Sequence, residues 1–270
     1  MEVFEELGLR GDVWPGATDR HGYFAGSHDA RAERLGDILR LATGPLWMIR
    51  GGYGAIHTLD RMVSSLRAFE SRALWGFSDG TVLLAEWVKQ GWPAWHAPPI
   101  TQLPRLDEES RTRLKNAFFR GDVAPFDGLK TLREGMAKGP IVGGNLTVLA
   151  SMVGTAHQAQ LSDCIVLLED VGESAYRVDR MMTQMKLSGS LRGIAGLLIG
   201  QFTDIPDREV EKIQVFFADL SRELNVPCAW GLPVGHGTAN CVIPLGRATG
   251  IFATLHAAWG TSRLEFNRHG

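Results

Sequence analysis

Short apolar runs alternate with amphipathic stretches along most of the chain. The apolar runs predict buried strands at 45–50 (PLWMIR), 72–77 (RALWGF), 93–99 (PAWHAPP), 164–170 (CIVLLED) and 194–202 (IAGLLIGQF). Apolar residues at helical spacing predict helices at 53–66, 79–91, 175–187 and 208–224. Two further runs near the end, GIFATLHAAW and SRLEFN, predict strands joined by the turn GTS. Strands that alternate with helices indicate the α/β class.

The alternation is interrupted once, between residues 101 and 138. This stretch holds one polar helix and a segment marked by proline and glycine, and it has no strong strand pattern. We therefore expect an N-terminal domain over 1–100, a linker over 101–138 and a C-terminal domain over 139–270.

Composition describes an ordinary globular protein. The chain has 270 residues, of which 44% are hydrophobic and 21% charged, and its formal net charge is −2. This charge gives no reason to expect nucleic acid or an anionic membrane as a partner. The acidic start MEVFEELGLRGD has no signal-peptide pattern and no run is long enough to span a bilayer, so a cytoplasmic location is expected. The three cysteines, Cys164, Cys228 and Cys241, have no metal-site or disulfide spacing.

A candidate nucleophile lies where the strand at 72–77 meets the next helix. Gly76-Phe77-Ser78-Asp79-Gly80 fits the pattern G-x-S-x-G, in which a tight strand-to-helix turn exposes a serine hydroxyl. Ser78 or Asp79 could equally serve as the N-cap of the following helix, because both side chains satisfy free N–H groups there. The local sequence leaves the two interpretations open.

A serine nucleophile needs a base and a carboxylate that orients the base. Among the eight histidines, His236 lies between glycines in the loop GLPVGHGTAN, the setting in which catalytic groups are often carried. Glu169 ends the apolar run IVLLE, at the edge where α/β sheets place functional groups. Asp170 and Glu173 follow it, and for them we expect the role of helix cap near Ser174.

Two glycine pairs follow or end apolar runs. RGGYG (50–54) allows backbone N–H groups to approach a ligand, as an oxyanion hole requires, but it lacks the spacing of a phosphate-binding loop. VGGN (142–145) is open to the same two interpretations, and both pairs are also compatible with plain tight turns.

Taken in order, these strings resemble the LD-carboxypeptidase family of serine peptidases, which includes muramoyl-tetrapeptide carboxypeptidases and microcin C self-immunity proteins. The resemblance runs from about residue 22 to about residue 250. It rests on RGGYG, GFSDGT, HAPP, GGNLTVLASMVGT, LLEDVGESAYRVDRM, GLLIGQFTD, GLPVGHG and IPLG.

The resemblance implies a Ser-Glu-His triad of Ser78, Glu169 and His236. It also implies an oxyanion hole formed by the backbone N–H groups of Gly52 and Asp79. The fold implied is an N-terminal parallel, flavodoxin-like α/β domain and a smaller C-terminal α/β domain with the active site between them, commonly in a homodimer. Neither a metal nor another cofactor is expected.

The implied reaction is hydrolysis of the LD-peptide bond before the terminal D-alanine of a murein tetrapeptide. Arg50 and Arg180 are candidates for binding the substrate carboxylate. The first alternative is a hydrolase of peptidyl or aminoacyl nucleotides, as in microcin C immunity, with Trp92 or Trp95 as a platform for the base. The second is a non-catalytic binding protein on the same fold.

The sequence departs from the family pattern at three places. Gly80 occupies a position that is usually a bulky aliphatic residue, and a glycine in a first helical turn costs about 1 kcal/mol relative to alanine. HAPP replaces the commoner His-Gly-Pro, so His96 and its neighbours are expected to shape a different pocket. The sequence starts at a helical segment, EVFEELGL, where the family has a preceding strand; either an upstream start or a sheet without that element would account for this.

Overall fold

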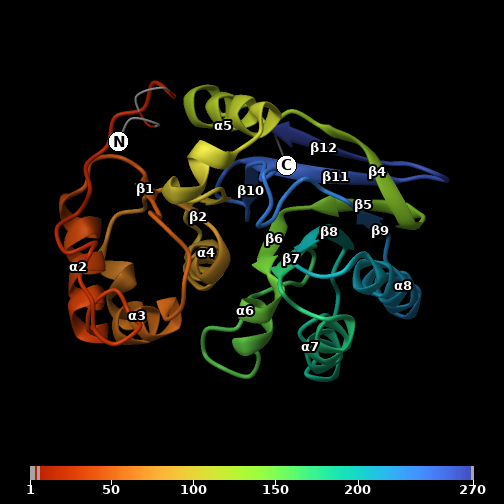
Figure 1. The fold of residues 1–270 in the computed structure, drawn as a ribbon, viewed down its shortest axis with the longest axis horizontal. Helices are drawn as coiled ribbons and strands as arrows, with labels where there is room; N and C mark the ends of the chain where they lie inside the picture. The colour runs from red at the N-terminus through yellow and green to blue at the C-terminus, as the bar shows by residue number, and fades with distance from the viewer. Residues whose placement is uncertain (1–3, 5–6, 269–270) are drawn as a thin grey trace.

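Two β-sheets organise the molecule (Figure 1), and the computed structural model describes residue 4 and residues 7–268. The smaller sheet has the spatial order β1 (Leu46–Trp47), β2 (Leu74–Gly76), β3 (Ala94–His96) and β10 (Ile243–Leu245). Its first three strands are parallel, and β10 runs antiparallel to β3. The α/β class predicted from the alternating pattern is confirmed.

The larger sheet is parallel in one half and antiparallel in the other. Its parallel half consists of β6 (Ile141–Asn145), β7 (Ile165–Val171), β8 (Gly196–Thr203) and β9 (Cys228–Trp230). Next to β9 follow β4 (Phe126–Arg133), β12 (Ser262–Arg268), β11 (Ile251–Ala257) and β5 (Gly135–Gly139), all paired antiparallel. The turn predicted between the last two strands joins β11 to β12.

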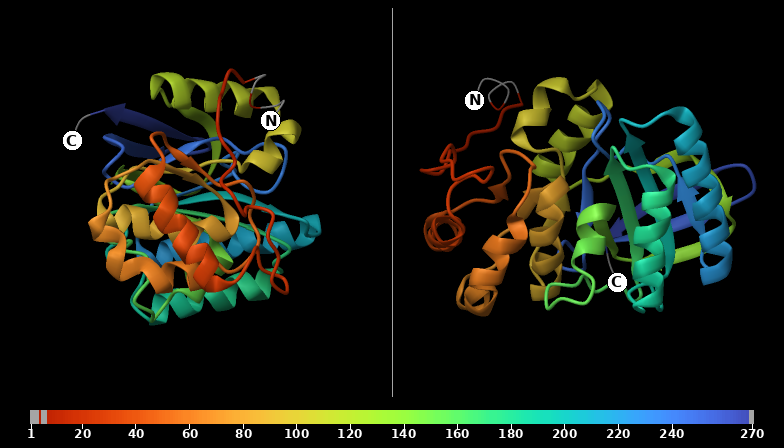
Figure 2. Two further views of the ribbon diagram at one scale, coloured as in Figure 1. Left: turned by 90° about the vertical axis from the view of Figure 1, so that its left-hand side faces the viewer. Right: turned by 60° about the horizontal axis from the view of Figure 1, so that its bottom comes forward.

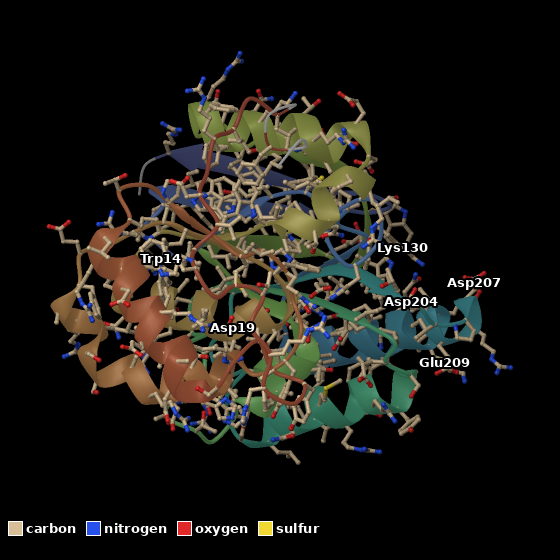
Figure 3. All side chains as sticks on the ribbon, turned by 60° about the vertical axis from the view of Figure 1, so that its left-hand side comes forward. Trp14, Asp19, Lys130, Asp204, Asp207 and Glu209 are labelled. Carbon is tan, nitrogen blue, oxygen red and sulfur yellow. The ribbon has the colours of Figure 1, made fainter. Side chains whose placement is uncertain are left out.

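Three helices lie near the smaller sheet, and the sequence pattern predicted the second and third of them. They are α2 (His28–Leu41), α3 (Ala55–Met62), continued by the 3₁₀ turn η1 (Val63–Ala68), and α4 (Thr81–Gln90), which ends at Gly91 in the left-handed conformation. A segment carrying Trp14 and Asp19 leads into α2 (Figure 3), and Asp19 forms an ion pair with Arg34 of that helix. Half of the residues of the helix expected at EVFEELGL lie outside the described part of the chain.

Three helices pack beside the parallel half of the larger sheet (Figure 2): α6 (Leu146–Ser151), α7 (Ala175–Leu187) and α8 (Asp207–Leu224). The apolar stripe predicted for α8 faces inward, with Ile213, Phe217 and Leu220 buried. The same holds in α7, where Val178, Met182 and Met185 are buried. Amphipathic periodicity therefore placed these two helices to within a residue.

Residues 101–138 contain more regular structure than a linker. The polar helix expected there is α5 (Glu108–Arg120), which follows the 3₁₀ turn η3 (Ile100–Arg105), but β4 and β5 also lie in this stretch and belong to the larger sheet. The sequence does not reveal them because β4 is half exposed and β5 begins and ends with glycine, which weakens the strand pattern. The boundaries proposed for the domains remain a prediction.

One apolar core runs through both sheets, and α4 contacts β6 where they meet. The glycines of VGGN lie in β6, not in a turn, and both have positive φ angles. A Cβ on Gly144 would lie 2.7 Å from Oγ1 of Thr81, the first residue of α4. Glycine is needed at this position because strand and helix approach each other closely.

Candidate active site

Ser78 lies on a sharp turn between β2 and α4. It begins the short 3₁₀ turn η2 (Ser78–Gly80) and has a φ angle of 57°, in the left-handed region that residues other than glycine rarely adopt. A Cβ on Gly76 or Gly80 would come within 2.7 or 2.2 Å of the sulfur of Met48. Met48 therefore fills the space beside both glycines of the G-x-S-x-G string, which accounts for the unusual Gly80.

The capping interpretation applies to Asp79, but for another helix than expected. Asp79 Oδ2 accepts a hydrogen bond from the backbone N–H of Ala55, the first residue of α3, at 2.8 Å. Neither Ser78 nor Asp79 caps α4, whose N-terminus has no side-chain cap. Burial raises the pKa of the half-buried Asp79 carboxyl group, and the backbone hydrogen bond from Ala55 opposes that shift. The carboxylate thus ties the serine turn to the loop that precedes α3.

His236 connects Ser78 to Glu169. Its Nε2 lies 3.2 Å from Ser78 Oγ, and its Nδ1 lies 2.8 Å from Glu169 Oε2. In the tautomer protonated on Nδ1, the imidazole donates to Glu169 and accepts the hydroxyl proton of Ser78. The structure therefore brings the three predicted residues into one hydrogen-bonded line, although they are far apart in the sequence.

Glu169 is fully buried near the carboxyl end of β7. Burial raises the pKa of its carboxyl group, and the hydrogen bond with His236 opposes that shift. Its second oxygen, Oε1, has no hydrogen-bond partner among the described residues. A carboxylate so placed interacts most strongly with a positively charged imidazole, since little solvent screens the pair.

The loop that carries His236 passes closely over β8. The backbone oxygen of Val234 accepts a hydrogen bond from the N–H of Gln201 at 2.8 Å, and a Cβ on Gly200 would lie 2.6 Å from the same oxygen. Gly200 therefore permits the loop to lie against the strand. The ring of Phe77 packs 4.4 Å from that of His236, so the residue before the serine also touches the base.

The RGGYG loop lies beside the serine. A Cβ on Gly51 would be 2.9 Å from Cβ of Ser78, whereas nothing lies within 4 Å of a Cβ on Gly52. Gly51 thus makes the close approach, and Gly52, with a φ angle of 141°, faces open space. Among the described hydrogen bonds, the N–H groups of Gly52 and Asp79 donate to no other residue. Both donors are thus available to a ligand.

The two candidate arginines have different surroundings. Arg50 is exposed in the RGGYG loop, and its Nε donates to the backbone oxygen of Gly51 at 3.2 Å. Arg180 is exposed on α7, with its guanidinium 5.3 Å from the ring centre of Tyr176. In the described part of the chain, no hydrogen bond or ion pair joins Arg180 to Ser78 or His236.

The tryptophans considered as a nucleobase platform are buried. Trp95 stacks on Trp75 with ring centres 4.8 Å apart, and Trp92 packs edge-on against Trp87. Both Trp92 and Trp95 are only 8% exposed. They belong to the core and offer no free ring face for stacking with a ligand.

Asp170 caps a different helix from the one expected. Its Oδ2 accepts from the N–H of Thr147 in the first turn of α6, at 2.8 Å. The N–H of Ala175, at the start of α7, instead donates to Glu209, which lies near the start of α8 with Asp204 and Asp207 (Figure 3). Local sequence did not reveal either cap because each partner comes from another element.

Three residues at the site escaped the sequence analysis or were given no definite role in it. His96, at the end of β3, is fully buried with its ring centre 5.1 Å from that of Phe77. Gln102 and Asn240 are buried amides that contact the His236 loop. No motif marks the two amides, because isolated amides in irregular segments have no characteristic spacing.

The described residues hold neither a candidate metal site nor a helix suited to crossing a membrane. They contain no group of three or more His, Cys, Asp or Glu side chains arranged to hold a metal ion. None of the described helices combines the length and apolar character that crossing a membrane requires.

Two protein-family models match the chain. Residues 1–97 match the LD-carboxypeptidase N-terminal domain, and residues 138–251 match the LD-carboxypeptidase C-terminal domain. The murein tetrapeptide carboxypeptidase of Pseudomonas aeruginosa is 33% identical over 243 residues, which cover 84% of this chain and 79% of that protein.

Solved structures show the same architecture. A muramoyltetrapeptide carboxypeptidase from Oxalobacter formigenes has a TM-score of 0.77 and 25% identity, covering 93% of this chain and 88% of the other. A MccF-like protein from Streptococcus pneumoniae, solved in complex with AMP, has a TM-score of 0.83 and 19% identity, covering 99% and 91%. At that identity the second likeness shows the fold alone.

Proposed function

Because the chain belongs to the LD-carboxypeptidase family, we propose that it is a serine-type carboxypeptidase that removes the terminal D-alanine from a murein tetrapeptide. The observation that carries the proposal is the hydrogen-bonded line from Ser78 through His236 to Glu169. A serine, a base and a buried carboxylate in this order form the arrangement that activates a hydroxyl for attack on an amide.

Acylation begins when Ser78 Oγ attacks the carbonyl carbon of the diamino acid. His236 Nε2 takes the hydroxyl proton, and Glu169 stabilises the imidazolium that forms. The imidazolium then donates this proton to the amide nitrogen as the C–N bond breaks, and D-alanine leaves. Water, deprotonated by the same imidazole, attacks the resulting ester and releases the tripeptide with Ser78 restored.

The negative charge that develops on the carbonyl oxygen needs hydrogen-bond donors. In the proposal these are the backbone N–H groups of Gly52 and Asp79, which flank Ser78 and donate to no other described residue. One such donor contributes about 3 kcal/mol to transition-state stabilisation. Asp79 thereby has two roles, because its carboxylate also holds the start of α3 and with it the loop that carries Gly52.

The substrate carboxylate needs a cation near the leaving group. Arg50 is the better supported candidate, since it lies in the same loop as Gly52 and its side chain is exposed. Arg180 remains the second candidate. The cytoplasmic location and the homodimer remain predictions of the sequence.

The decisive assay uses L-Ala-γ-D-Glu-meso-diaminopimelate-D-Ala, with D-alanine release followed by mass spectrometry. We expect release by the wild type and none by Ser78→Ala. The same peptide ending in L-alanine tests stereospecificity, and an aminoacyl nucleotide tests the microcin-type alternative. Cleavage of the nucleotide alone would replace the proposed reaction, although the buried Trp92 and Trp95 provide no support for that outcome. If the wild type and Ser78→Ala bound the tetrapeptide equally and neither cleaved it, the non-catalytic alternative would be favoured.

A further inference from the structure

Two buried amide side chains enclose the loop that carries His236. Gln102 comes from η3 and is 6% exposed, and Asn240 follows His236 in the chain and is fully buried. Gln102 lies outside both ranges matched by the family models, which end at residue 97 and begin again at 138. Neither amide takes part in the reaction steps described above.

The amides bond the backbone on both sides of His236. Gln102 Nε2 donates to the backbone oxygen of Gly237 at 2.9 Å and, more weakly, to that of Gly235 at 3.4 Å. Asn240 Oδ1 accepts from the N–H of Gly235 at 3.3 Å. Side chains therefore hold backbone groups of Gly235 and Gly237, the residues on either side of His236. The loop around His236 has no strand pairing among the described residues to hold it.

The two amides also bond each other. Asn240 Nδ2 donates to Gln102 Oε1 at 2.8 Å, so each amide is fixed by the other. The backbone N–H of Asn240 donates to Ser110 Oγ at 3.0 Å, and that of Asp107 donates to the oxygen of Thr238, also at 3.0 Å. The loop thus rests on residues 102–110, in the stretch where the sequence predicts a linker.

We propose that Gln102 and Asn240 are positioning residues that fix the His236 loop, so that Nε2 faces Ser78 while Nδ1 faces Glu169. Gly235 and Gly237 flank His236, and glycine leaves a backbone more conformational freedom than any other residue. Without the amides, the flanking peptides lose bonds that define the imidazole position. A displacement of about 1 Å from productive geometry lowers a rate by about 100-fold.

The test is Gln102→Met, which keeps the length of the side chain and removes its hydrogen bonds. We expect kcat for D-alanine release to fall 10- to 100-fold with KM changed less than threefold, because the variant acts on His236 and leaves the substrate contacts in place. The labelling rate of Ser78 by a fluorophosphonate probe should fall by a similar factor. Gln90→Met is the matched control, since Gln90 bonds Glu86 at the far end of α4.

A second variant separates positioning from a general loss of packing. In Gln102→Glu, the ionised carboxylate repels the oxygen of Gly237, whereas the protonated carboxyl group donates to it again. The ratio of variant to wild-type labelling should therefore rise toward one as the pH falls, and burial favours the protonated form. A purely structural defect predicts a ratio that stays well below one at every pH.

The proposal rests on the proposed function, and the probe distinguishes the failure of each. A wild type that neither reacts with the probe nor releases D-alanine would contradict the proposed function. A reactive wild type together with a folded Gln102→Met that labels within threefold of it would overturn the positioning role alone. An equal loss in Gln90→Met, or a ratio in Gln102→Glu that stays well below one at every pH, would also overturn it.

Discussion

Asp79 and Ala55 are joined by a hydrogen bond of 2.8 Å between a carboxylate of the serine turn and the first N–H of α3. The bond couples two loops that the proposed reaction uses together. We expect Asp79→Ala to lower the free energy of unfolding by about 1 kcal/mol, the usual cost of losing a helix cap. We also expect it to lower kcat, because the RGGYG loop is no longer tied to the serine. Denaturant unfolding and the D-alanine assay measure the two effects.

Ser27→Ala provides the control for Asp79→Ala. Ser27 caps α2 by accepting a hydrogen bond from the N–H of Ala30 at 3.2 Å, away from Ser78 in the chain. Its loss should reduce stability by a similar amount and leave kcat unchanged. If the two variants had equal kcat, the Asp79 carboxylate would be a helix cap without effect on the reaction.

Whether a feature can be predicted from the sequence depends on where in the chain its determinants lie. The turn at Ser78 and the helices α7 and α8 were predictable because short stretches of sequence determine them. The caps by Asp79 and Asp170 and the amide pair of Gln102 and Asn240 were not, because each joins segments distant in the chain. The resemblance to a family located Ser78, His236 and Glu169 without revealing what holds them together.

The strands that were missed follow the same rule. β4 and β5 gain their place by pairing with β9, β12 and β11 in the larger sheet, and their own residues alternate weakly. β10 is three residues long and contains Pro244, which is tolerated because the strand lies at the edge of its sheet. Pairing supplied by distant strands is not visible in a local pattern.

We expect a glycine at position 51 to be essential for the position of Ser78, because a side chain there would have no room. The backbone conformation of Gly51 does not itself require glycine. A Cβ at this position would lie 2.9 Å from Cβ and 3.1 Å from Oγ of Ser78, closer than such atoms pack. Gly51→Ala should therefore displace the serine and reduce fluorophosphonate labelling by about tenfold or more. Gly44→Ala is the matched control, because nothing lies within 4 Å of a Cβ there. Equal labelling of the two variants would mean that the loop adjusts without moving Ser78.

Backbone strain at Ser78 predicts that replacing the serine by glycine relieves strain while it abolishes activity. With φ at 57°, any side chain at this position costs on the order of 1 kcal/mol, which glycine avoids. Ser78→Gly should therefore be about 1 kcal/mol more stable to unfolding than Ser78→Ala, although both lack the nucleophile and neither releases D-alanine. Urea unfolding of the two variants measures the difference. Equal stability would show that the turn is unstrained.

His96 makes the protein sensitive to acid. Burial lowers its pKa from 6.5 to about 3, and the nearby His236 adds to the shift. Neither ring nitrogen has a hydrogen-bond partner among the described residues. As the pH falls below 6.5, His96 becomes protonated in the unfolded chain but stays neutral in the folded protein. The stability that is present above pH 6.5 is therefore lost progressively down to about pH 3.

The loss amounts to about 2 kcal/mol by pH 5, since each pH unit in this window contributes about 1.4 kcal/mol. His96→Leu removes the titrating group and keeps a similar volume, so its stability should fall less between pH 7 and pH 5 than that of the wild type. His21→Leu, at an exposed position, should retain the wild-type loss. Urea unfolding at the two pH values provides the comparison. If His96→Leu lost as much stability as the wild type, other groups would account for the acid sensitivity.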